Sequence, residues 1–258
     1  MSAAAGTLVI FDCDGVLVDS ERLVIDIDVA AVTAAGWPMT REQAIETFVG
    51  RSNADVVAMI EAQVGHPLPS DWDAAWEADY RRVFDELLEP VPGVRAAVEQ
   101  VMGQGRRTCV ASSGSHAKMR RTLGRTGLWD LFEGRIHSAT EVEHGKPAPD
   151  LFLHAAASMQ VDPARCVVVE DSRYGVAAAR AAGMAVVGFA GGITPEHHLT
   201  DADVVITDMA VLPAARAAVT PYRLSSTTTH RAGSTFIAAA ACRNRSGAGL
   251  PCSTSVAL

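Results

Sequence analysis

The sequence predicts an α/β fold in which helices cover both faces of a parallel sheet. Short apolar runs rich in β-branched residues alternate with helical stretches, a rhythm typical of parallel sheets. The expected strands are residues 7–11, 107–112, 135–138, 165–169, 184–189 and 203–206. The interval from Ser20 to Glu89 breaks the rhythm, because it predicts several helices in succession. The chain is therefore expected to form a Rossmann-like core with a small helical cap domain inserted into it.

The predicted domain organisation has a core, an insertion and a tail. Residues 1–19 and 91–222 form the core, and residues 20–90 form the cap. Residues 223–258 are rich in Ser, Thr, Ala and Gly, contain no acidic side chain and show no sustained hydrophobic period. Such a composition favours a disordered extension, so we expect the tail to lie outside the catalytic unit.

Two carboxylates follow the first predicted strand. The apolar run 8–11 leads directly into Asp12, Cys13, Asp14 and Gly15. Side chains alternate along a strand, so Asp12 and Asp14 are expected to point the same way and Cys13 to turn away. Adjacent carboxylates repel unless a cation lies between them, and Mg²⁺ is a hard cation that prefers oxygen ligands. An acidic turn that binds no ion is the alternative.

Hydroxyl side chains follow the strand predicted at 107–112. Ser112, Ser113 and Ser115 lie at the junction between this strand and a helix that begins near Ser115. Free backbone N–H groups at such a junction, together with a Ser hydroxyl, form a cradle for an anion. The alternative is that Ser115 only caps the helix.

Lysine is rare in this chain, because its 22 basic residues include only Lys118 and Lys146. Lys146 lies in a loop that Pro147 and Pro149 stiffen, and Pro149 suits the first turn of the helix that follows. A compact ammonium on a stiff loop suits one oxygen of a phosphoryl group. The alternative is an ordinary solvated lysine.

A second pair of carboxylates, Glu170 and Asp171, follows the strand predicted at 165–169. The next residues, from Arg173 to Ala182, predict a helix. As further Mg²⁺ ligands the two carboxylates would complete the site that begins at the first strand. Alternatively, one of them is only the N-cap of the helix.

The order of these four segments resembles the four motifs of the haloacid dehalogenase (HAD) superfamily. The resemblance covers residues 7–192, in which the matching positions are Asp12-Cys13-Asp14-Gly15, Ser112, Lys146-Pro147 and Glu170-Asp171. Within the superfamily, the chain is similar to the capped enzymes of the phosphoglycolate phosphatase, β-phosphoglucomutase and 6-phosphogluconate phosphatase group. The resemblance implies a phosphatase that acts on a small phosphorylated metabolite, a sugar phosphate or a sugar-acid phosphate.

The resemblance also assigns chemical roles. Asp12 is expected to be the nucleophile that forms an aspartyl-phosphate. Asp14 is expected to protonate the leaving oxygen and later to accept a proton from water. Ser112, Ser113 and Lys146 are expected to bind the remaining phosphoryl oxygens.

The expected cofactor is Mg²⁺. By resemblance, its ligands are Asp12, the main-chain carbonyl of Asp14, and Asp171, with Glu170 beside them or acting through water. The ion would offset the repulsion between the nucleophile and an anionic substrate.

Two loops outside the four motifs carry candidate residues. In capped relatives, the loop that corresponds to Arg51 faces the active site and helps to choose the substrate, which makes Arg51 a candidate specificity residue. A solvated loop arginine is the alternative. His197 and His198 are interpreted as surface residues rather than a metal site, because no partner ligand has a suitable spacing in the sequence.

Other activities of the superfamily fit less well. Family dehalogenases lack an acid at the position of Asp14, and phosphonate-cleaving relatives need a cap lysine, which the chain lacks between Ser20 and Pro90. Phosphoglucomutase relatives carry a cap lysine and a histidine where this chain has Val24. The absence of these two residues weakens the hypothesis of a mutase but does not eliminate it. A mutase remains as an alternative, as does a non-catalytic phosphate-binding protein on the same scaffold.

The net charge and the cysteine positions indicate which binding partners are disfavoured and which cellular compartment is expected. Residues 1–222 carry a net charge of −12, which disfavours binding to nucleic acid or to an anionic membrane. Cys13, Cys109 and Cys166 lie at or just after apolar strands, where buried free thiols are typical of a reducing compartment. No signal peptide is predicted, so a cytoplasmic location is expected. The sequence leaves the exact substrate and the oligomeric state open.

Overall fold

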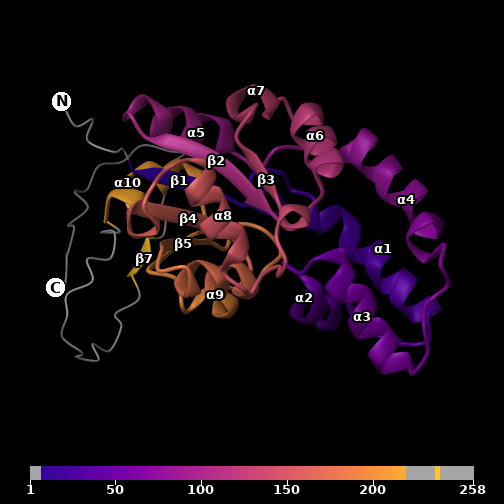
Figure 1. Ribbon diagram of the computed structural model, residues 1–258. Coiled ribbons are helices and arrows are strands. Elements are labelled where there is room, and N and C mark those ends of the chain that lie inside the picture. The colour runs from indigo at the N-terminus through magenta and orange to yellow at the C-terminus, as the bar shows by residue number, and fades with distance from the viewer. Residues whose placement is uncertain (1–6, 219–235, 239–258) are drawn as a thin grey trace, which may run out of the picture.

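The computed structural model of the protein describes residues 7–218 and 236–238, which contain a parallel sheet of order β3-β2-β1-β4-β5-β6-β7 (Figure 1). The strands are β1 (Leu8–Phe11), β2 (Arg107–Ser112), β3 (Ile136–Ser138), β4 (Cys166–Glu170), β5 (Ala185–Phe189), β6 (Val204–Ile206) and β7 (Phe236–Ala238). All six strands predicted from the sequence are confirmed to within one residue at each end.

Helices cover both faces of the sheet, as predicted. One face carries α5 (Val94–Gly103), α6 (His116–Arg125), α7 (Trp129–Phe132) and α10 (Leu212–Ala218). The other carries α8 (Asp150–Ser158) and α9 (Arg173–Ala181). The 3₁₀ turns are η1 (Ala139–Glu141), η2 (Pro163–Arg165), η3 (Glu196–Leu199) and η4 (Met209–Val211). Because both faces are covered, strands such as β1 are continuously apolar, with Val9 in one core and Ile10 in the other.

Four successive helices occupy residues 20–90, which we call the helical insertion. They are α1 (Glu21–Ala34), α2 (Arg41–Phe48), α3 (Asn53–Val64) and α4 (Trp72–Leu87). The insertion has a small apolar core of its own that includes Ile25, Phe48 and Ile60. It lies beyond one end of the sheet, with α4 next to α6 (Figure 1).

The site is positioned by the point at which the strand order reverses. β1 pairs with β2 on one side and with β4 on the other, both in parallel register. The chain therefore leaves β1 and β4 in the same direction, and the loops that follow them lie against each other at Gly15 and Asp171. Open α/β sheets bind their ligands at such a switch point.

The prediction of a disordered tail is wrong for residues 236–238, because they form β7 and pair with β6. Backbone pairing at an open sheet edge needs no particular period in the sequence, so this short strand gave no signal. The rest of the predicted tail after residue 222 lies outside the described residues, as do Cys242 and Cys252. Cys13, Cys109 and Cys166 are buried free thiols, as predicted. Within the described residues, no helix combines the length and hydrophobicity that crossing a membrane requires.

Candidate active site

The loop after β1 carries two carboxylates in a tight turn. Asp12 is buried, and its backbone N–H donates to Val169 of β4 at 3.0 Å. Cys13 turns into the apolar core, as predicted, and Asp14 follows it. Gly15 has a φ of +72°, and a Cβ built there would lie 2.0 Å from an Asp171 carboxylate oxygen. Only glycine lets these two loops approach so closely.

Lys146 joins the two strand ends through ion pairs. Its buried ammonium lies 3.0 Å from Asp12 Oδ1 and 2.8 Å from Glu170 Oε2. Burial alone would lower the pKa of Lys146, but the two carboxylates outweigh it and raise the pKa. Burial and then Glu170 raise the pKa of Asp12 to about 7, although Lys146 opposes the shift. One ammonium is therefore too little positive charge for the carboxylates that surround it.

A divalent cation fits this group of residues. Asp12, Glu170 and Asp171 are buried, and each offers a carboxylate oxygen within 4.8 Å of those of the other two. Burial, Glu170 and Asp12 raise the pKa of Asp171 well above its usual range. Apart from its ion pair with Lys146, the buried Asp12 Oδ1 has no hydrogen-bond partner in the described part of the chain. Oxygen ligands with unneutralised negative charge are the donor set of a hard cation such as Mg²⁺.

Ser172, rather than Glu170 or Asp171, caps α9. Its hydroxyl accepts from the backbone N–H of Gly175 at 3.0 Å and donates to Glu170 Oε1 at 2.7 Å. The alternative reading of an acidic N-cap is therefore wrong. A Ser hydroxyl both accepts and donates, so it can cap the helix and orient a carboxylate together. Glu170 thus uses one oxygen on Ser172 and the other on Lys146, which favours an orienting role.

The sequence-based prediction missed the partners of Asp14. Lys118 Nζ lies 2.9 Å from Asp14 Oδ2, and the Ser20 hydroxyl donates to Oδ1 at 2.6 Å. Burial would raise the pKa of Asp14, but these two partners outweigh it and lower the pKa. The only available signal in the sequence was that Lys118 is one of two lysines.

The loop after β2 brings hydroxyl groups close to Asp14. The hydroxyl of buried Ser112 accepts from Gly114 N at 3.2 Å, and Ser113 Oγ lies 3.5 Å from the Gly50 carbonyl. A Cβ added at Gly114 would lie within 4 Å of Asp14 Oδ2, the Ser112 hydroxyl and the Lys118 chain. Ser115 accepts from Lys118 N and caps α6, as the simpler interpretation predicted.

A cavity of about 630 Å³ opens between the helical insertion and α6. Its lining is largely apolar and aromatic. The charged side chains in it are four basic and three acidic residues: Arg51, Arg81, Lys118, Arg121, Glu21, Asp28 and Glu77. Arg51 is held in place, because its guanidinium donates to the Tyr174 hydroxyl at 2.7 Å and lies 4.0 Å from the centre of that ring. Arg51 therefore lies at the contact between the insertion and α9 rather than in solvent.

A family model described as haloacid dehalogenase-like hydrolase matches residues 7–183. The chain belongs to the haloacid dehalogenase-like hydrolases. The family prediction is thus confirmed, and with it the prediction of a hydrolase of the phosphatase type. The roles of the individual site residues of this HAD-like hydrolase stay predictions.

Relatives of this HAD-like hydrolase cover the core and the insertion. The 6-phosphogluconate phosphatase of Escherichia coli is 30% identical over 182 residues, which are 70% of this chain and 81% of the relative. A solved haloacid dehalogenase-like protein of unknown function from Agrobacterium tumefaciens is 37% identical, with a TM-score of 0.70 and coverage of 83% of this chain and 98% of that one. A HAD family hydrolase from Deinococcus radiodurans with bound phosphate and sodium is 28% identical, with a TM-score of 0.64 and coverage of 85% and 100%.

In this HAD-like hydrolase, Glu21 lines the cavity, and its carboxylate and that of Asp14 repel each other. Burial and then Asp14 raise the pKa of Glu21 to about 8. In the unfolded chain, the carboxyl group of Glu21 loses its proton near pH 4.5, whereas in the folded chain it keeps the proton until about pH 8. Ionised Glu21 is therefore disfavoured in the folded state, and it lowers the stability progressively as the pH rises between these values.

We therefore expect Glu21→Gln to stabilise the metal-free protein by roughly 1–2 kcal/mol at pH 8 and by much less at pH 5. Melting temperatures measured at both pH values in a chelating buffer test this. Exposed Glu99→Gln on α5 is the control and should show no such pH dependence. A melting-temperature difference for Glu21→Gln that is the same at pH 5 and pH 8 would contradict the assignment.

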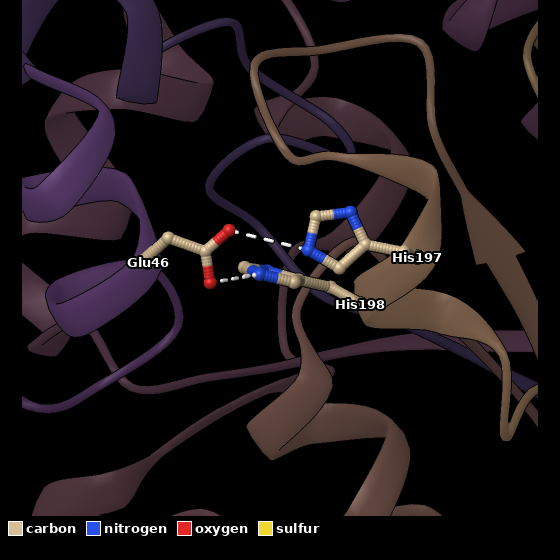
Figure 2. A group of neighbouring side chains, drawn as sticks. All are labelled: Glu46, His197 and His198. Atoms are coloured by element: carbon tan, nitrogen blue, oxygen red, sulfur yellow. Dashed lines mark hydrogen bonds and ion pairs between the residues drawn. The ribbon is translucent and has the colours of Figure 1, made fainter.

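His197 is exposed, as predicted, but the interpretation of His198 as a surface residue is wrong, and both imidazoles have a partner ligand that the sequence did not reveal. Figure 2 shows that Glu46, on α2 of the insertion, directs one carboxylate oxygen to each imidazole. His198 Nε2 lies 2.6 Å from Glu46 Oε2, and His197 Nε2 lies 3.2 Å from Oε1. The His198 side chain is only 4% exposed, and Arg173 Nη1 lies 3.7 Å from Oε2. The partner is 152 positions away in the sequence, so no local spacing reveals it.

This Glu46 cluster joins the helical insertion to η3 of the core. We expect Glu46→Gln to lower the melting temperature by about 2–4 °C at neutral pH, because a buried imidazole loses a charged partner. The double variant with His198→Ala measures the coupling between the two residues. Strictly additive effects of the two substitutions would show that the contact contributes nothing.

Proposed function

We propose that the protein is a Mg²⁺-dependent phosphatase that hydrolyses a small sugar phosphate or sugar-acid phosphate through an aspartyl-phosphate on Asp12. The observation that carries the proposal is the buried group at the switch point, where three carboxylates cluster and the Lys146 ammonium pairs with two of them, Asp12 and Glu170. The family membership and the two relatives that are a 6-phosphogluconate phosphatase and a phosphate-bound hydrolase support it.

Asp12 and Asp171, with the main-chain carbonyl of Asp14, would hold the cation, and Glu170 would orient the group. The bound ion supplies positive charge that offsets the repulsion between Asp12 and an anionic phosphoryl group. In its absence, the pKa of about 7 leaves much of Asp12 protonated and unable to attack. Activity is therefore expected to need the metal for the charge state of the nucleophile as well as for substrate binding.

Phosphoryl transfer then divides into two displacements. A carboxylate oxygen of Asp12 forms a bond to phosphorus while the bond to the leaving oxygen breaks, and Asp14 gives its proton to that oxygen. Water next attacks the phosphorus of the aspartyl-phosphate, Asp14 accepts the proton of that water, and Asp12 is released with inorganic phosphate. Ser112, Ser113 and Lys146 hold the other phosphoryl oxygens.

The ion pair between Lys118 and Asp14 affects the first displacement, in which Asp14 protonates the leaving oxygen. In the free protein, Lys118 and Ser20 lower the pKa of Asp14, which opposes its role as an acid. A bound phosphoryl group adds negative charge beside Asp14 and competes for the Lys118 ammonium, and both effects raise the pKa of Asp14. Substrate binding would therefore prepare the proton donor.

The helical insertion would act as the cap. The cavity of about 630 Å³ lies between the insertion and α6 and is of the size that small-molecule sites have. Lys118, which pairs with Asp14, also lines this cavity, so the leaving group of a substrate held at Asp12 can extend into it. Arg51 would contact the leaving group or its charged substituent.

The test is phosphate release from a panel of phosphorylated metabolites, in Mg²⁺ and in chelator. The panel contains sugar phosphates, sugar-acid phosphates and one aryl phosphate, because aromatic side chains contribute to the cavity. We expect Mg²⁺-dependent release of inorganic phosphate with a preference for sugar or sugar-acid phosphates. Binding of the esters without release, or isomerised sugar phosphate as the main product, would contradict the proposal.

A further inference from the structure

A second cluster of metal-ligating side chains lies in the core, apart from the carboxylates of the active site. It consists of His116 at the start of α6, His137 on β3, Glu141 in η1 and His154 on α8. Ligand atoms of His137, Glu141 and His154 lie within 4.8 Å of one another. The consecutive elements β3 and η1, together with α6 and α8, therefore bring three imidazoles and one carboxylate together.

The separations suit a tetrahedral metal ion. Glu141 Oε2 lies 3.3 Å from His116 Nε2 and 3.8 Å from His154 Nε2. Ligands that bind zinc at about 2.1 Å in a tetrahedron lie roughly 3.4 Å from one another. The ring centres of His137 and His154 are 5.4 Å apart, with the planes at 78°. Small side-chain adjustments would thus direct His137, Glu141 and His154 to one point, and His116 approaches the same Glu141 oxygen from α6.

The burial of His137 is an independent indication of a metal site. The residue is 8% exposed, and its buried Nε2 has no hydrogen-bond partner among the residues that the structure describes. A buried polar atom without a partner is costly, and a metal ion nearby offers one way to satisfy an imidazole nitrogen.

The Glu141 carboxylate is also oriented in a way that suits cation binding. The backbone N–H of Ser138 donates to Glu141 Oε2 at 2.7 Å and orients the carboxylate. Within the described residues, the ion-pair partners of Glu141 are only His116 and His154. The Glu46 cluster differs, because there Arg173 already supplies positive charge.

We propose that His116, His137, Glu141 and His154 form a binding site for Zn²⁺ or a similar transition-metal ion. His116, Glu141 and His154 are partly exposed, which gives the ion a path from solvent. The site would tie the start of α6 to β3 and α8. It lies beside the loop after β2, because the Ser138 hydroxyl donates to the Gly114 carbonyl at 2.7 Å. A bound ion would therefore stiffen the loop that is expected to hold phosphate.

The test measures metal binding to the full chain in excess Mg²⁺, which occupies oxygen sites but does not compete well for imidazole. We expect one Zn²⁺ per chain by calorimetry, and visible absorption bands of tetrahedral cobalt when Co²⁺ is added instead. His154→Ala and Glu141→Gln are expected to weaken Zn²⁺ binding at least about 100-fold. The melting temperature of the unmodified protein is expected to rise with Zn²⁺, and that of Glu141→Gln is not.

Two control variants separate this site from other histidines. His144→Ala removes an exposed imidazole that pairs with Asp150 outside the cluster, and His197→Ala disrupts the Glu46 cluster. Both are expected to keep the affinity for Zn²⁺. Absence of Zn²⁺ binding, equal affinity in the unmodified protein and His154→Ala, or loss of affinity in His197→Ala instead would overturn the proposal. None of these measurements depends on phosphatase activity.

Discussion

We expect Asp12→Asn to reduce Mg²⁺-dependent phosphate release by about 10⁴-fold or more, because the amide cannot form the phosphoryl-enzyme. The measurement is the steady-state rate with the best substrate of the panel. An acid quench during turnover is also expected to trap phosphate covalently on the unmodified chain and not on the variant.

The fold of this variant is expected to survive. Asp12 is one of three buried carboxylates that repel one another, and its raised pKa shows that the charged form is disfavoured in the metal-free protein. Asn at this position removes one charge and leaves Lys146 paired with Glu170 at 2.8 Å. Asp12→Asn should therefore melt no lower than the unmodified protein above pH 7 in chelator.

Asp19→Asn is the matched control, because Asp19 lies seven positions after Asp12 in the same loop and, among the described residues, forms an ion pair only with the exposed Arg22. We expect it to keep its activity. If Asp12→Asn retained more than a tenth of the activity, or if Asp19→Asn lost as much as Asp12→Asn, the assignment of the nucleophile would fail.

Lys146→Met is expected to cause the largest loss of stability, about 3–5 kcal/mol, which corresponds to a fall of roughly 10 °C in melting temperature. Met fills a similar volume, but Asp12 and Glu170 then remain buried without their ammonium. The loss is expected to shrink as the pH falls, because protonation removes the repulsion between the carboxylates, and also when Mg²⁺ is added.

Lys118→Met is the control with the same change of side chain. Lys118 is 38% exposed and pairs with a single carboxylate, Asp14, so we expect a loss of stability below about 1 kcal/mol. Thermal melts of both variants, in chelator and in Mg²⁺, distinguish the two lysines. Similar losses of stability in both would show that the buried pairs of Lys146 have no special role.

The strands and the four motif loops were predictable because their signals are local. A short β-branched run such as Val167–Val169 is apolar on both faces, and the charged residues that follow it mark its end. Parallel strands then bring their carboxyl ends to one edge. The convergence of Asp12, Lys146 and Asp171 thus follows from the order of the motifs, and the resemblance to a known family supplied the expected role of each residue.

Contacts inside single turns were harder to predict. Glu170, Asp171 and Ser172 are adjacent, and each is an acceptable N-cap by residue type. The structure shows that Ser172 takes this position while Glu170 bonds to Lys146. The position of the Lys146 ammonium, which binds Glu170, therefore decides which of these three neighbouring side chains caps α9.

The sequence by itself determined the order of strands and helices in the core and the polar groups at the ends of its strands. The tertiary structure decided which distant side chains meet: Lys118 with Asp14, Glu46 with His197 and His198, and Glu141 with His116 and His154. Periodicity and propensity act over a few residues, whereas these pairs form only when separate elements pack. Their partners are therefore set by the packing of the folded chain, which no local pattern in the sequence encodes.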